Sequence, residues 1–94
     1  MTCERVEFVG KTKEQISHHR RDGITEAWVE SIVLNAEESD REYLPDASFK
    51  IAVKTKKPSG VNITVIIYAR EEVFKIDDRI VWRTCKVFGI HVEG

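Results

Sequence analysis

The sequence predicts a single α+β domain in which two N-terminal helices pack on one face of an antiparallel sheet. The first third of the chain carries a helical period, and the chain after residue 48 alternates with a period of two. A length of 94 residues, 41% of them hydrophobic and 33% charged, suits one soluble core and excludes a disordered chain. The expected order over residues 1–94 is β-α-α-β-β-β.

The chain is expected to begin with a short strand and a short helix. Residues 4–9 alternate as a strand does, and a glycine follows them. Thr12 is a suitable N-cap, and Gln15 stands at the spacing of a capping box, so a helix is predicted over residues 13–20. Gly23 supplies the left-handed residue that commonly ends a helix.

The second helix has the clearest pattern in the chain. Thr25 is its expected N-cap, and Ile24 is placed to pack on Val29 as a hydrophobic staple. One apolar stripe follows at helical spacing: Trp28, Val29, Ile32, Val33 and Ala36. The acidic residues 37–46 that come next are expected to form a surface connection.

Three strands are expected in the second half. Residues 49–56 alternate apolar with mostly basic side chains, which indicates a half-buried strand with a basic outer face. Residues 61–70 are apolar in both phases and are placed in the middle of the sheet. Residues 80–88 form the last strand, which the tail can extend. Residues 71–76 read equally as strand or loop before a turn at residues 77–78.

Charge is balanced over the whole chain but uneven along it. The formal net charge is −1, which argues against a surface built entirely for nucleic acid. Residues 37–46 hold five acids and one base, whereas residues 48–70 hold five bases and no acid. An anionic partner is therefore expected at the basic strands, although such a charge run also serves simply as a solvated face.

No membrane segment, cofactor or metal site is expected. The longest uncharged apolar stretch, residues 60–69, is too short to cross a membrane, and no signal-peptide pattern opens the chain. A cytoplasmic location follows as the expectation. There, Cys3 and Cys85 are expected to be free thiols, although one disulfide is formally possible. Adjacent His18 and His19 point in different directions on a helix and do not suit one ion.

Two stretches resemble small toxins of the RelE/ParE superfamily, especially its BrnT-like and related uncharacterised domains. Residues 16–25 are similar to the His, then Arg-x-Gly-Ile-Ser/Thr pattern that joins the two helices of those domains, and residues 78–84 are similar to their final strand. The resemblance implies a RelE-like fold and either messenger RNA cleavage or binding of a cognate antitoxin-like protein. The chain departs from the pattern at Phe88 and the tail, which replace a terminal tyrosine.

An open sheet face opposite the helices would be the candidate site for RNA or a protein partner. Its expected residues are Lys50, Lys54, Tyr68, Arg70 and Arg83. The two arginines suit bidentate phosphate contacts, and Tyr68 suits base stacking. Alternatively, strand lysines only keep sheet edges soluble.

Catalysis is expected to be absent. Metal-free RNA cleavage needs a proton acceptor beside the phosphate contacts, and the available candidates are His91 and Tyr68. His91 lies in the tail, and the reference pKa of tyrosine, about 10, suits an acid better than a base. The resemblance thus implies a toxin-like or toxin-derived cytoplasmic domain that engages RNA or a cognate protein. The alternative is a noncatalytic interaction module that forms a homodimer or binds an acidic partner.

Overall fold

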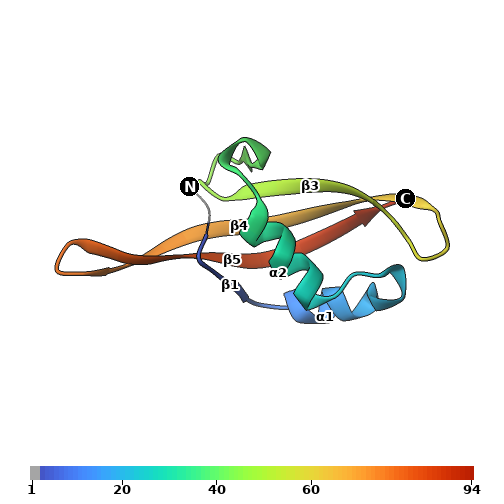
Figure 1. Cartoon of the computed structure of the whole chain (residues 1–94), viewed down its shortest axis with the longest axis horizontal. Coiled ribbons are helices and arrows are strands. Elements are labelled where there is room, and N and C mark those ends of the chain that lie inside the picture. The colour runs from blue at the N-terminus through green and yellow to red at the C-terminus, as the bar shows by residue number, and fades with distance from the viewer. Residues whose placement is uncertain (1–2) are drawn as a thin grey trace.

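The computed structural model describes residues 3–94; the expected domain, residues 1–94, also includes residues 1 and 2, which lie outside this range. Two helices lie on one face of an elongated, twisted sheet (Figure 1). The elements in chain order are β1 (Arg5–Phe8), α1 (Thr12–His18), η1 (Arg20–Asp22), α2 (Glu26–Asn35), η2 (Glu38–Asp40), β2 (Glu42–Tyr43), β3 (Phe49–Lys56), β4 (Asn62–Ile76) and β5 (Arg79–Glu93).

The sheet is mixed rather than antiparallel. Its strand order is β1-β5-β4-β3-β2, and β1 runs parallel to β5 while the other pairs are antiparallel. The helices carry the chain from one edge of the sheet to the other, which strand periodicity cannot reveal. The short strand β2 is also additional, because it lies in the segment expected to be a surface connection. The α+β class is confirmed, and its detailed order is corrected.

Helix α1 begins differently from the expectation. Lys11 is its N-cap, and the Thr12 hydroxyl instead donates to the carbonyl oxygens of Val9 and Val87, at 2.6 Å and 3.0 Å. The Gln15 side chain accepts from the backbone N–H of Ile90 at 3.1 Å. Both side chains therefore fasten the helix to β5, and the predicted capping box is wrong.

Helix α2 matches the sequence pattern. The Thr25 hydroxyl accepts from the backbone N–H of Trp28 at 3.1 Å, which confirms the N-cap. Val29 and Val33 are fully buried, and Trp28 and Ile32 pack at the edge of the core. The strands provide the opposite wall of this core with the buried side chains Phe49, Ile51, Ile63, Val65, Ile67, Ala69, Cys85, Val87 and Ile90.

Strands β4 and β5 extend well beyond their neighbours. Pairing with β3 ends at Ala69, and pairing with β1 begins at Thr84. Residues 72–83 therefore form a two-stranded ribbon, here called the arm, which projects at the left of Figure 1. Asp77 and Asp78 both have positive φ, as a two-residue hairpin turn of type I′ requires. This settles residues 71–76 as strand.

The two cysteines are joined. Cys3 and Cys85 form a disulfide with their Cα atoms 5.7 Å apart, so the expectation of two free thiols is wrong. Their separation in sequence gave no sign of contact; the parallel pairing of β1 with β5 creates it. No helix within residues 3–94 has the length and apolar character needed to cross a membrane.

Candidate functional site

The sheet face that points away from α1 and α2 is called here the open face. No helix of residues 3–94 covers it, because both long helices lie on the opposite side (Figure 1). Strand alternation sends the following side chains to it: Lys50, Ala52, Lys54, Thr64, Ile66, Tyr68, Arg70, Glu72, Lys86, His91 and Glu93.

The strand register brings most of the predicted binding residues together. Lys50 stands directly opposite Tyr68, and Lys54 stands opposite Thr64 on the same face. Arg70 follows Tyr68 by two residues and stands opposite Lys86. Side chains of directly paired residues lie within contact range, so Lys50 lies beside Tyr68, whereas Lys54 lies four positions away along the sheet, about 13 Å at strand rise.

A second ring, missed by the sequence analysis, completes this group. The Phe88 ring is exposed, and its centroid is 6.2 Å from that of Tyr68, with the planes tilted by 39°. The guanidinium of Arg70 is 5.7 Å from the Phe88 ring centroid. The register shifts beside Tyr68, and Gly89 stands opposite this tyrosine. A glycine inside a strand pattern often marks a β-bulge, so Gly89 could have suggested the register shift that exposes Phe88.

Acidic neighbours neutralise part of the open face. Lys50 lies 3.6 Å from Glu42, and Lys86 lies 2.8 Å from Glu72. The Lys86 hydrogen bond and charge lower the pKa of the Glu72 carboxyl, and the same contact raises the pKa of Lys86. Within residues 3–94, Lys54 forms no ion pair, so its charge stays available to a partner.

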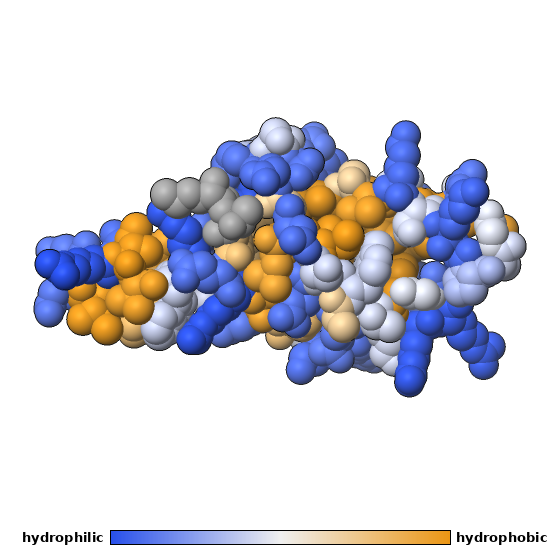
Figure 2. All heavy atoms as spheres, in the orientation of Figure 1, coloured by the Kyte–Doolittle hydropathy of each residue, from blue (hydrophilic) through white to orange (hydrophobic). Residues whose placement is uncertain are grey.

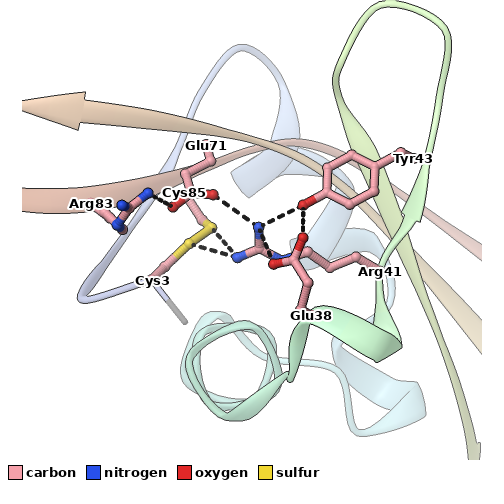
Figure 3. Close-up of a disulfide and its surroundings, with 7 residues drawn as sticks. All are labelled: Cys3, Glu38, Arg41, Tyr43, Glu71, Arg83 and Cys85. Atoms are coloured by element: carbon pink, nitrogen blue, oxygen red, sulfur yellow. Dashed lines mark hydrogen bonds and ion pairs between the residues drawn. A yellow bond between two sulfur atoms is a disulfide. The ribbon is translucent and has the colours of Figure 1, made fainter. Parts of the chain in front are cut away.

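Arg83 does not belong to the open face. It pairs with Val73 on the helix side of the sheet, where its guanidinium lies 3.3 Å from a carboxylate oxygen of Glu71 (Figure 3). The predicted pair of phosphate clamps, Arg70 and Arg83, is therefore divided between two faces. Residues 80–88 were expected to form a strand, which is confirmed, but the expected face of Arg83 is wrong, and β5 contains two register irregularities that shift its alternation.

Arg41 occupies the helix-side cluster and was not predicted as important. Its side chain is only 1% exposed, and its Nη1 lies 2.9 Å from Glu71 and 3.3 Å from the Tyr43 hydroxyl (Figure 3). Burial lowers the pKa of Arg41, but hydrogen bonds with Tyr43 and Glu71 outweigh this and raise it, so it stays charged. The sequence held one sign of this role: Arg41 is the single basic residue in the acidic segment 37–46.

His91 lies on the open face but away from the arginine. It is exposed, stands opposite Ile66, and lies 3.6 Å from Glu93. Four residues separate Ile66 from Arg70 along β4, or about 13 Å at strand rise. The candidate proton acceptor and the phosphate contact are therefore not adjacent. Tyr68 lies between these two levels of the sheet.

The open face combines the charges of Lys54 and Arg70 with the half-buried ring of Tyr68 and the exposed ring of Phe88, which is chemistry for binding. No group of histidine, cysteine or acidic side chains within residues 3–94 is arranged to hold a metal ion. Among known proteins, no family, no curated protein and no solved structure matches this chain.

Proposed function

We propose that this protein is a cytoplasmic, toxin-derived domain that binds single-stranded RNA on its open face without cleaving it. The observation that carries the proposal is the pair of neighbouring rings, Tyr68 and Phe88, beside the guanidinium of Arg70. Lys50 and Lys54 extend the positive charge along the same face.

The arrangement suits a flexible single strand better than a duplex. Unstacked bases can lie on exposed aromatic rings, and such stacking contributes about 1–3 kcal/mol per base. Lys54 and Arg70 would meet the phosphates that connect stacked bases. The helices lie on the other side of the sheet (Figure 1), so no helix within residues 3–94 covers the face across which the strand would run.

Cleavage is not part of the proposal, because the groups it needs are separated. A general base must come within about 3 Å of the proton it removes, next to the group that stabilises the phosphate charge. His91 and Arg70 are four positions apart along the sheet. We expect purified protein to leave RNA intact, with or without ribosomes.

The binding assay compares two double variants of equal charge change. Lys50→Gln with Lys54→Gln removes two charges from the open face, and Arg20→Gln with Arg21→Gln removes two from exposed positions beyond α1. Fluorescence anisotropy with labelled oligouridine should show weaker binding and a flatter salt dependence for the lysine variant only. Equal losses in the two variants, or no binding by the wild type at low salt, would reject the proposal.

The arm favours a second candidate function, self-association as a noncatalytic module. It exposes Val73, Phe74, Ile76, Ile80 and Val81, and an apolar surface lies at its end in Figure 2. No strand within residues 3–94 lies beside either edge of the arm, so the same edge of a second copy can pair with it antiparallel about a two-fold axis.

Light scattering tests this candidate directly. The wild type should be a concentration-dependent dimer, and Ile76→Ser with Ile80→Ser on the arm should make it monomeric. Val61→Ser, at an exposed position outside the arm, is the matched control and should leave the dimer intact. A wild type that stays monomeric at high concentration excludes self-association.

A further inference from the structure

The guanidinium of Arg41 lies against the disulfide with an incomplete set of hydrogen bonds. Its Nη2 lies 3.4 Å from the Cys3 sulfur and 3.7 Å from the Cys85 sulfur (Figure 3). Sulfur in a disulfide is a weak acceptor. The buried Nε has no hydrogen-bond partner within residues 3–94. While the disulfide is closed, the Nη2 and Nε groups of Arg41 therefore lack strong hydrogen-bond acceptors.

A thiolate at either sulfur would change this balance. It would bring a negative charge to the position where Nη2 now meets weak acceptors, and hydrogen bonds between charged groups are roughly twice as strong as neutral ones. Arginine beside a cysteine also favours its thiolate form. We infer that Cys3 and Cys85 form a reversible thiol–disulfide exchange site for small thiols, whose reduced state is stabilised by Arg41.

The charged groups around the sulfurs allow this role. Glu71 lies between Arg41 and Arg83, at 2.9 Å and 3.3 Å, and Glu38 lies 3.6 Å from Arg41. The Tyr43 hydroxyl donates to Glu38 and lowers the pKa of that carboxyl. The carboxylates occupy the Nη1 side of Arg41, so its Nη2 side remains directed at the sulfurs.

The exchange begins at Cys3. Both cysteines are buried, Cys3 with 4% and Cys85 with 0% of the residue exposed, but Cys3 lies before β1 and is followed by exposed Glu4 and Arg5, whereas Cys85 lies within β5. A small thiolate attacks the Cys3 sulfur, the bond between the two cysteines breaks, and Cys85 leaves as the thiolate facing Arg41. A second thiolate attacks the external sulfur of the mixed disulfide and releases Cys3 as a thiolate. Two external thiols thereby supply two electrons and become one external disulfide.

The inference is independent of RNA binding and agrees with the proposed cytoplasmic location. Disulfides in that compartment are rare, and those that occur are usually transient or redox-sensing. Because β1 is an edge strand that pairs with β5 over four residues, reduction removes a covalent link beside this short pairing. The site therefore connects the redox state to the attachment of β1.

A redox titration of the folded protein tests the site. Protein is equilibrated in buffers of different ratios of reduced to oxidised dithiothreitol, then trapped by alkylation and counted by mass spectrometry. We expect full, reversible conversion between the disulfide and two alkylated cysteines. Arg41→Gln should shift the equilibrium about tenfold toward the disulfide, while Arg83→Gln, which contacts Glu71 but neither sulfur, should leave it unchanged.

A second measurement avoids dependence on the folding of the Arg41 variant. In the reduced wild type, ultraviolet thiolate absorbance should appear at a pH at least about one unit below the ordinary cysteine value of about 8.5. Three results would overturn the inference: two free thiols under oxidising buffer, irreversible loss of structure on reduction, or thiolate absorbance that appears only at or above the ordinary value.

Discussion

Individual polar side chains decide how the elements of this protein are fastened together, and they are the features that sequence patterns describe least well. Thr12 has the sequence position of an N-cap, yet its buried hydroxyl joins the start of α1 to β5. Arg41 has the sequence context of a solvent-exposed charge, yet it is buried over the Phe49 ring at 4.2 Å. The sequence shows that a threonine and an arginine stand at these positions, but it does not show their distant partners, such as Val87 for Thr12 and Glu71 for Arg41.

Replacing Thr12 with valine should destabilise the protein by about 1–3 kcal/mol, because two carbonyl groups lose a hydrogen bond while the side-chain shape is kept. Urea unfolding followed by circular dichroism measures the change. Ser17→Ala, on an exposed position of the same helix, is the control and should change the free energy of unfolding by less than about 0.5 kcal/mol. Equal changes in both variants would show that the Thr12 hydroxyl is not a fastening contact.

The ion pair of Glu72 with Lys86 should make stability depend on pH in the acid range. The Lys86 contact lowers the pKa of Glu72 below its ordinary 4.5, so the carboxylate contributes stability above that pH and loses it as the pH falls through the folded-state pKa. Glu72→Gln should therefore flatten the fall in stability below pH about 4.5. Unfolding curves at a series of pH values test this, and parallel curves for variant and wild type would contradict it.

At the scale of whole elements, periodicity was a reliable guide to the buried faces of α2, β3 and β4, but not to that of β5, where Arg83 was expected on the wrong side. The α2 stripe and the alternation of β3 and β4 both point into one core, as expected. Strand direction was not predictable, because β1 reads the same whether it runs parallel or antiparallel to β5. The bulge after Tyr68 was equally hidden, and it determines that Phe88 is exposed beside that ring.

The two faces of β4 should respond differently to the same truncation. Ile67 is fully buried against the helices, and Ile67→Ala should cost about 2–5 kcal/mol of unfolding free energy. Ile66→Ala, the neighbouring residue on the open face, removes a half-buried side chain and should cost clearly less. The two variants are compared by their urea unfolding midpoints, provided that the dependence of unfolding free energy on urea concentration has the same slope in both. A larger loss for Ile66 would mean that the open face is itself covered.

As a whole, the molecule has a compact helix-covered end and a projecting arm, with extents of 50 × 24 × 22 Å. The candidate binding face could be predicted in part: Lys50, Lys54, Tyr68 and Arg70 share it, whereas Arg83 does not. The turn at residues 77–78 that closes the arm was expected, but the length of the arm depends on where β1 and β3 stop pairing, and the disulfide depends on the parallel pairing of β1 with β5.

The most direct test of the central claim is a map of where RNA touches the protein. Backbone amide NMR signals of the folded chain are followed during titration with oligouridine at low salt. Shifts are expected to be concentrated at Lys54, Tyr68, Arg70 and Phe88 on the open face, with α2 and the arm unchanged. Shifts confined to the helices or the arm, or no shift at any site, would contradict an RNA-binding open face.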